Sequence, residues 1–169
     1  KLIDNCGTGG DKSNSFNIST TVSIILATCG CYVAKHGNRG VTSKSGSADM
    51  LEALGINLNL NFENSAKILE ETGFTFMFAQ NHHPALKNIM SIRKSIPHRT
   101  IFNILGPLSN PATVSKQLVG VFDKSYINKL AYAMDMLDTK RSIIVSSNDG
   151  MDEISISDIT YATSLYNGK

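Results

Sequence analysis

The feature that most constrains the fold is a glycine-rich stretch near the start of the chain, Gly7-Thr8-Gly9-Gly10. It follows a short apolar segment, Leu2-Ile3, and precedes an apolar run with helical character, residues 18–27. Closely spaced glycines let the backbone turn sharply and approach a ligand, and a turn that leads into a helix gathers backbone N–H groups at one point. We therefore predict a strand, a phosphate-binding turn and a helix, in that order.

This turn departs from the two standard phosphate-binding loops. The Walker loop ends in Gly-Lys-Ser/Thr, whereas Lys12 here follows Asp11. The dinucleotide-binding fingerprint needs glycine at its first, third and sixth positions, and the sixth position counted from Gly7 is Lys12. Because the Asp11 carboxylate would repel a bare phosphate, we expect it to face sugar hydroxyls or a metal ion.

Beyond the turn, short apolar segments alternate with helical ones. The expected strands span residues 31–34, 74–79, 117–122, 142–145 and 154–161. The expected helices span residues 18–27, 48–54, 62–72, 85–94 and 126–137. Asn17 or Ser19 could cap the first helix, Gly73 could end the third, and Pro84 could open the fourth. This alternation predicts an α/β fold with a mainly parallel central sheet flanked by helices.

Polar clusters follow the predicted strands, at the sheet edge where α/β proteins bind ligands. Residues 35–47 are basic and rich in hydroxyls, and Asp152-Glu153 lies in an acidic loop. His82-His83, which precedes a helix that carries Arg93, is expected to form a separate set. Adjacent carboxylates suit a hard cation such as Mg²⁺. Each cluster has a plainer alternative: a linker, a helix start with surface charges, or a solvated turn. The glycine turn, the basic residues and the acidic pair together predict a ligand with a diphosphate and a metal ion.

Composition excludes several other classes of protein. The net charge of +2 is too small to indicate a nucleic-acid or membrane-surface partner, so we expect neither. The spacing of Cys6, Cys29 and Cys31 fits neither a disulfide framework nor a zinc site. No apolar run is as long as a membrane span. We expect one domain of a cytoplasmic protein, with reduced thiols.

Seven motifs resemble the anthranilate phosphoribosyltransferase family and occur in the same order as in that family. They are Gly7-Thr8-Gly9-Gly10-Asp11, Asn17-Ile18-Ser19-Thr20, Lys35-His36-Gly37-Asn38-Arg39, Ser45-Gly46-Ser47-Ala48-Asp49, His82-His83-Pro84-Ala85, Phe102-Asn103-Ile104-Leu105-Gly106-Pro107-Leu108 and Asp152-Glu153. The resemblance runs over the whole chain. It implies the catalytic-domain fold of the nucleoside phosphorylase/phosphoribosyltransferase class.

The resemblance also implies an activity. Members of the family act in tryptophan biosynthesis, a pathway of aromatic amino-acid biosynthesis. They are glycosyltransferases that transfer the phosphoribosyl group of 5-phosphoribosyl 1-pyrophosphate to the amine of anthranilate and release pyrophosphate. They require Mg²⁺.

Site residues follow from the resemblance, position by position. The residues implied for phosphoribosyl pyrophosphate are Gly7, Gly10, Asp11, Ser15, Asn17, Ile18, Ser19, Thr20, Lys35, His36, Gly37, Asn38, Arg39, Gly40, Val41, Thr42, Ser43 and Ser47. Those implied for anthranilate are Gly7, Asn38 and Arg93, and those implied for the metal ion are Ser19, Asp152 and Glu153. No general acid or base is implied, so catalysis would rest on positioning and electrostatics.

Family members are longer than this chain. Residues 1–169 would form a partial α/β catalytic domain, without the family's N-terminal helical domain and C-terminal part. The full-length protein is expected to be a homodimer and could associate with a glutamine amidotransferase.

Two alternatives stay open. A pyrimidine nucleoside phosphorylase has the same broad architecture but would not need the Asp152-Glu153 pair. A non-catalytic homologue that binds nucleic acid or a protein partner should carry a strongly basic face, which the net charge of +2 disfavours.

Arg93→Ala tests the implied anthranilate contact. A guanidinium pairs with a carboxylate through two parallel hydrogen bonds, so its loss should raise the KM for anthranilate far more than the KM for the donor. Steady-state kinetics with each substrate varied in turn measure both constants. Equal increases would remove Arg93 from the acceptor site.

Overall fold

The computed structural model describes residues 1–168, apart from residues 12, 14, 41–44, 85–95 and 97. The helix expected over residues 85–94 lies outside the described residues. So do four of the implied ligand contacts, at Val41, Thr42, Ser43 and Arg93.

Six strands form one sheet among the described residues, in the order β3-β2-β1-β4-β5-β6. They are β1 (Leu2–Gly7), β2 (Tyr32–Gly37), β3 (Phe74–Phe78), β4 (Lys116–Gly120), β5 (Arg141–Ser147) and β6 (Thr160–Tyr166). Neighbours from β3 through β5 pair in parallel, and β6 pairs antiparallel to β5. The predicted mainly parallel α/β sheet is confirmed.

Along the sequence, the described helices lie in the segments that connect the strands. They are α1 (Ile18–Thr28), α2 (Ser47–Ala53), α3 (Phe62–Thr72), α4 (Ala79–His82) and α6 (Ile127–Met136), with short 3₁₀ helices at Ile101–Asn103, Gly106–Leu108 and Lys124–Tyr126. Helix α3 has the predicted bounds because Gly73, at φ 76°, ends it in the left-handed conformation. Among the described residues, no helix has the length and apolar character needed to cross a membrane.

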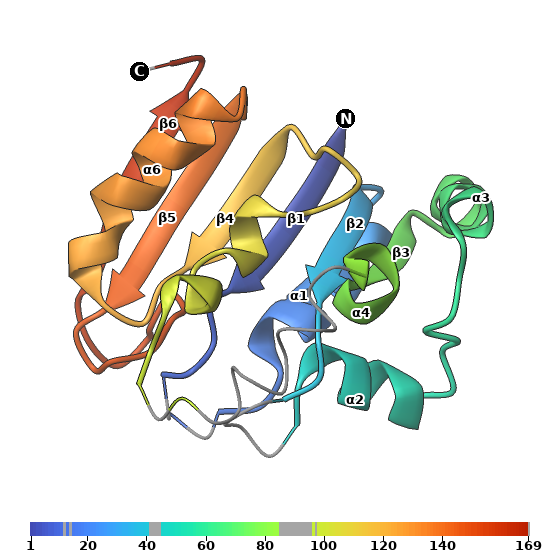
Figure 1. The fold of residues 1–169 in the computed structure, drawn as a ribbon, viewed down its shortest axis with the longest axis horizontal. Helices are drawn as coiled ribbons and strands as arrows, with labels where there is room; N and C mark the ends of the chain where they lie inside the picture. The colour runs from blue at the N-terminus through green and yellow to red at the C-terminus, as the bar shows by residue number, and fades with distance from the viewer. Residues whose placement is uncertain (12, 14, 41–44, 85–95, 97, 169) are drawn as a thin grey trace.

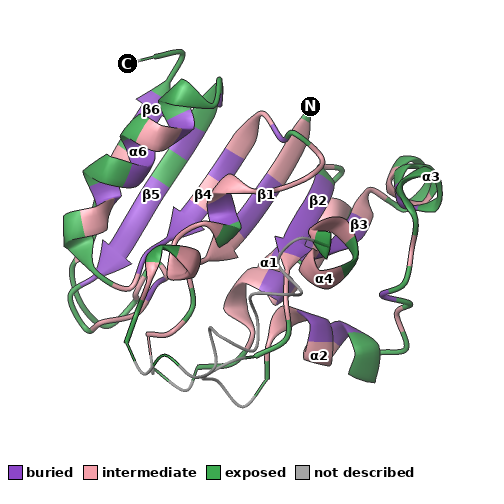
Figure 2. Cartoon of the chain, viewed as in Figure 1, coloured by how far each residue is buried: buried purple, intermediate pink, exposed green. Residues whose placement is uncertain are grey.

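The two faces of the sheet carry different elements. In Figure 1, α6 lies in front of β5 and β6, and α1 lies behind β1 and β2. Neighbouring residues of a strand point to opposite faces. Accordingly, the Asp4 carboxylate bonds to Asn110 on one side, and the Asn5 amide bonds to Ser19 of α1 on the other. Figure 2 shows the buried residues concentrated along the strands between these layers.

Three local predictions were wrong. The side chain of Asn17 does not cap α1; its amide donates instead to Ser45 O at 3.2 Å. Strand β2 continues to Gly37, so the segment predicted as a loop from residue 35 begins as strand. The strand expected over 154–161 starts only at Thr160, because local hydrogen bonds hold residues 155–159 in a loop.

The strands β1, β2, β4 and β5 end at one edge of the sheet, where the connecting loops gather at the lower side of Figure 1. The loop that follows β5 crosses this edge very close to the ends of β1 and β4. A Cβ atom added at Gly120 would lie 1.5 Å from Asp152 O, and one added at Gly7 would lie 2.2 Å from Asp152 Oδ2. Only glycine at these two strand ends lets the acidic loop reach its position.

Gly120→Ala should therefore destabilise the protein, because the methyl group would collide with the backbone of Asp152. We expect a cost of about 1–3 kcal/mol or more in the free energy of unfolding. The matched control is Gly106→Ala, since a Cβ there would meet nothing within 4 Å. Urea denaturation of both variants measures the difference, and equal effects would show that the close approach at Gly120 costs nothing to relieve.

Candidate functional site

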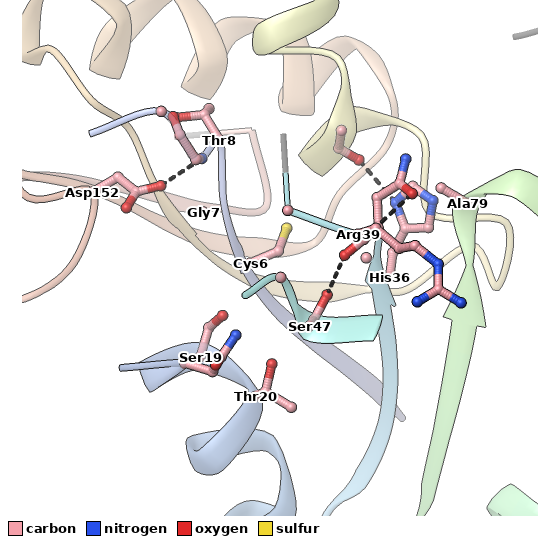
Figure 3. Close-up of a pocket in the computed structure, with 18 of the residues that line it drawn as sticks. Cys6, Gly7, Thr8, Ser19, Thr20, His36, Arg39, Ser47, Ala79 and Asp152 are labelled. Atoms are coloured by element: carbon pink, nitrogen blue, oxygen red, sulfur yellow. Dashed lines mark hydrogen bonds between the residues drawn. The ribbon is translucent and has the colours of Figure 1, made fainter. Parts of the chain in front are cut away.

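A cavity of about 330 Å³ opens at the carboxyl ends of the strands. Its walls come from the turn after β1, the start of α1, the end of β2, the start of α2, the segment 102–109 and the loop after β5. Figure 3 shows Asp152 and Thr8 on one side, His36 and Arg39 on the other, and Ser19 and Thr20 at the start of α1. Parallel α/β sheets bind ligands at this edge.

Every described residue that the resemblance implied lines this one cavity, although they come from four separate stretches of the chain. These residues are Gly7, Gly10, Asp11, Ser15, Asn17, Ile18, Ser19, Thr20, Lys35, His36, Gly37, Asn38, Arg39, Gly40, Ser47, Asp152 and Glu153. The fold thus brings the predicted site residues together.

The glycine turn is closed partly by protein groups. Gly9 and Gly10 have φ of 69° and 75°, in the left-handed region that favours glycine. The Gly9 N–H donates to Asp152 Oδ2 at 2.7 Å, and the Thr8 N–H donates to Gly120 O at 2.9 Å. Two N–H groups of the turn therefore hold the acidic loop and β4, and the turn is ordered by the protein itself.

Negative charge collects beside this turn. Burial, followed by the charge of Asp11, raises the pKa of Asp152 to about 6, with the Gly9 N–H acting in the opposite direction. Burial and the Asp152 charge raise the pKa of Glu153 to about 7, while Lys35 and the Ser19 N–H lower it. Both carboxyls therefore lose part of their hydration, and the charges of their acidic neighbours add to the effect.

The donor set fits Mg²⁺ held jointly with a ligand. Among the described residues, no group of three His, Cys, Asp or Glu side chains is arranged to hold a metal ion alone. Mg²⁺ usually takes one or two carboxylates plus substrate phosphates and keeps several waters. Asp152 and Glu153 supply the carboxylates, and the Ser19 hydroxyl supplies a neutral oxygen. Burial raises the pKa of both carboxyls, and a divalent cation in place of their protons would stabilise the ionised forms.

Lys35 lies beneath the glycine turn with 1% of its surface exposed. Its ammonium donates to Asn5 O at 2.7 Å and to Ser19 Oγ at 3.3 Å. It therefore fixes the end of β1 to the start of α1. Its charge also lowers the pKa of Glu153. Lys35 therefore acts on the cavity through its charge as well as through its hydrogen bond to Ser19.

A pair of histidines stands on the opposite wall. His36 Nδ1 lies 3.0 Å from Gly106 O, an atom that can only accept, so Nδ1 carries the proton. Burial lowers the pKa of His36 to about 4, which leaves Nε2 as an acceptor at neutral pH. His83 Nε2, 3.2 Å away, must then be the donor. The prediction that His82-His83 lies apart from the other clusters was therefore wrong for His83.

The Arg39 guanidinium is already paired. It donates to Glu52 at 2.7 and 2.9 Å and to Asp49 at 3.0 Å. Asp49 also accepts from the backbone N–H groups of Gly40 at 2.9 Å and Gly46 at 2.8 Å. Arg39 lines the cavity, but its charge is directed to the acidic residues of α2 in this structure.

Other groups that shape the site carry no local signal in the sequence. The buried Asp4 carboxylate accepts from His36 N at 3.3 Å and from Asn110 Nδ2 at 2.8 Å, and burial raises its pKa. Arg99 donates to Gly10 O and stacks over the Phe122 ring, 3.8 Å from its centroid. These partners are distant in the sequence, so only the folded chain identifies them.

Glu153→Gln should become more stable relative to the wild type as the pH rises from about 4.5 to about 7. The carboxyl ionises near 4.5 in the unfolded chain but stays protonated up to about 7 in the folded protein. The unfolded state then holds fewer protons, so the wild type loses stability as the pH rises through this window. The rise from 4.5 to about 7 corresponds to at most about 3 kcal/mol.

Urea denaturation without divalent cations at several pH values in this window measures that difference. The control is Asp149→Asn, which changes an exposed carboxyl of the same loop whose pKa is lowered by Ser147 and Ser155. Because Asp149 is ionised in both states across most of the window, its variant should show no growing gain. A constant difference for Glu153→Gln would contradict the prediction.

Comparison with known proteins agrees with this geometry. The model of a glycosyl transferase family, a/b domain, matches residues 1–169. Anthranilate phosphoribosyltransferases from Vesicomyosocius okutanii and Aquifex aeolicus are 49% and 50% identical over 168 and 165 residues. The matches cover 99% and 98% of this chain, and 50% and 48% of those proteins. The chain thus spans about half the length of the curated relatives it matches.

Solved structures give the same result. Anthranilate phosphoribosyltransferase from Thermus thermophilus superposes with a TM-score of 0.87 at 38% identity, over 98% of this chain and 51% of that one. The Saccharomyces cerevisiae enzyme in complex with PRPP and Mg superposes with a TM-score of 0.89 at 32% identity, over 97% and 48%. The resemblance seen in the sequence motifs is confirmed. The chain therefore belongs to the glycosyl transferase family whose a/b domain its 169 residues match.

Proposed function

We propose that the protein containing this chain transfers the phosphoribosyl group of phosphoribosyl pyrophosphate to the amine of anthranilate. The chain would supply the donor half of the site. The observation that carries the proposal is the convergence of Ser19, Asp152 and Glu153 with the glycine turn in one cavity. The relatives named anthranilate phosphoribosyltransferase, and the yeast structure in complex with PRPP and Mg, support it.

The donor would lie along the glycine turn and the start of α1. The ribose and diphosphate oxygens need hydrogen-bond donors, which Asn17, Ser19, Thr20 and the end of β2 present to the cavity. Asp11, at the end of the turn, can accept from ribose hydroxyls or from metal-bound water. The acidic pair would hold the donor through the cation rather than by direct contact with its phosphates.

When bound, Mg²⁺ would neutralise charge on the diphosphate as it leaves. Asp152, Glu153 and Ser19 are the residues that would hold it. Lys35 keeps the Ser19 hydroxyl in place and adds a positive field beneath the leaving group. Groups that are already oriented in the folded protein need not reorganise during the reaction. Such preorganisation gives sites of this kind most of their rate enhancement.

The acceptor needs alignment more than activation. A neutral aromatic amine is already a nucleophile, and displacement at the anomeric carbon passes through oxocarbenium-like charge. Holding the amine on the open face of the ribose therefore supplies much of the rate enhancement. Asn38, on the cavity wall, and Arg93 are the residues proposed to orient anthranilate.

The acidic pair also weighs against the alternative of a pyrimidine nucleoside phosphorylase. A pyrimidine nucleoside phosphorylase binds inorganic phosphate and would gain nothing from the buried Asp152 and half-buried Glu153 carboxylates beside it. We further propose that the chain is part of a larger catalytic unit. The homodimer, the association with an amidotransferase and the cytoplasmic location stay predictions.

Calorimetry of the complete protein with phosphoribosyl pyrophosphate and Mg²⁺, followed by the loss of anthranilate fluorescence on turnover, tests the function.

The double variant Asp152→Asn with Glu153→Gln should weaken Mg²⁺-dependent donor binding by more than about tenfold. Asp149→Asn, in the same loop but outside the cavity lining, is the matched control. Unchanged Mg²⁺ dependence in the double variant would remove the acidic pair from the site.

A further inference from the structure

Two buried polar side chains link the sheet to α1 without taking part in the donor contacts proposed above. Asn5 of β1 is 2% exposed, and Ser23 of α1 is fully buried. Asn5 Nδ2 donates to Ser19 O at 2.9 Å, and the Ser23 hydroxyl donates to Asn5 Oδ1. The link therefore runs from the end of β1 to the first turn of the helix.

The Asn5 amide has only one satisfactory orientation. The Ser19 carbonyl can accept but not donate, so the NH₂ end of the amide must face it. The carbonyl end then faces Ser23, whose hydroxyl can donate. The same hydroxyl lies 2.8 Å from Ser19 O, and its single hydrogen serves one acceptor at a time. A flipped amide would set two acceptors against each other in a buried place, at a considerable free-energy cost.

Every polar group of Ser19 has a partner from a different element. Its carbonyl is held by Asn5, its hydroxyl accepts from Lys35 at 3.3 Å, and its N–H acts on the Glu153 carboxylate. Lys35 also donates to the main-chain carbonyl of Asn5 at 2.7 Å. Asn5 thus acts on Ser19 both through its side chain and through Lys35.

The N-cap position gives the start of α1 little support. Asn17, which occupies that position, makes no side-chain hydrogen bond to the first turn of α1. Without a side-chain cap, the first turn of a helix depends more on contacts from outside the helix to fix its place. In this chain, Asn5 supplies such a contact from the sheet through the Ser19 carbonyl, and Ser23 of the helix holds the other end of the Asn5 amide.

We propose that Asn5 and Ser23 are positioning residues for the donor site. They fix the first turn of α1 against β1 and so set the place of the Ser19 hydroxyl and N–H in the cavity. Neither side chain needs to touch the donor. The inference rests on the proposed function, because it assigns these residues to the diphosphate side of the same site.

The test compares Asn5→Leu and Ser23→Ala with Thr21→Val in the complete protein. Thr21 is the matched control, because its hydroxyl donates to Asn17 O at 3.0 Å within its own helix turn. We expect each of the first two variants to raise the KM for phosphoribosyl pyrophosphate by about tenfold, the effect of one lost buried hydrogen bond. The KM for anthranilate should not change comparably, and Thr21→Val should leave both constants near the wild-type values.

Hydrogen exchange without ligand provides the second measurement. The amides of residues 19–22 should exchange faster in Asn5→Leu and Ser23→Ala than in the wild type and in Thr21→Val. The combined variant should cost less than the sum of the single ones, because the two side chains act as one unit. If Asn5→Leu fails to fold, Ser23→Ala, which removes a single oxygen atom, still decides the matter.

Unchanged donor KM and unchanged exchange in both variants would overturn the inference while leaving the proposed function standing. Equal changes in the KM for donor and acceptor would also overturn it, since they indicate a general loss of structure. If the wild-type protein does not bind phosphoribosyl pyrophosphate, the proposed function fails and this inference fails with it.

Discussion

The site is built around one buried positive charge, the Lys35 ammonium. A charge removed from water is costly unless the protein surrounds it with acceptors and opposite charge. Lys35 meets both conditions, with the Asn5 carbonyl and the Ser19 hydroxyl in hydrogen-bond contact and the Asp4 and Glu153 carboxyls within electrostatic reach. The strand that carries it, the strand β1 before the glycine turn and the helix α1 after the turn are thereby held to a common point.

A second constraint is the space left open at two strand ends. Asp152 lies so close to Gly7 and Gly120 that no side chain could stand at either position. The carboxylate can then accept from the Gly9 N–H at 2.7 Å, inside the turn rather than above it. Charge and shape act together here: Gly7 and Gly120 leave room for the acidic loop, and the Gly9 N–H orients its carboxylate.

Much of this architecture could be predicted from the sequence. Regular alternation of apolar and helical segments indicated the parallel sheet, and Gly73 marked the end of α3. The strand expected over residues 154–161 was wrong, because Ser155 and Asp158 capture nearby backbone N–H groups and hold a loop instead. Strand preference describes a segment alone and does not include such side-chain competition.

The site was predictable in its parts but not in its connections. The glycine turn and the acidic pair stand out because their residue types follow strands. The link from Asp4 to Asn110, and the contact of His36 with His83, join residues whose closeness depends on which strands are neighbours. The pairing of Arg39 with Glu52 was missed for the same reason, since a basic loop residue gives no sign that a helix will neutralise it.

The bond from Gly9 N to Asp152 Oδ2 joins residues 143 positions apart. A contact of such long range closes most of the chain into a loop, and the entropy of that closure opposes it. The cavity is therefore completed only when the hairpin of β5 and β6 docks against the rest of the sheet. A ligand that contacts both the turn and the acidic loop would act as a cross-link between the first and last parts of the chain and raise the stability of the docked state.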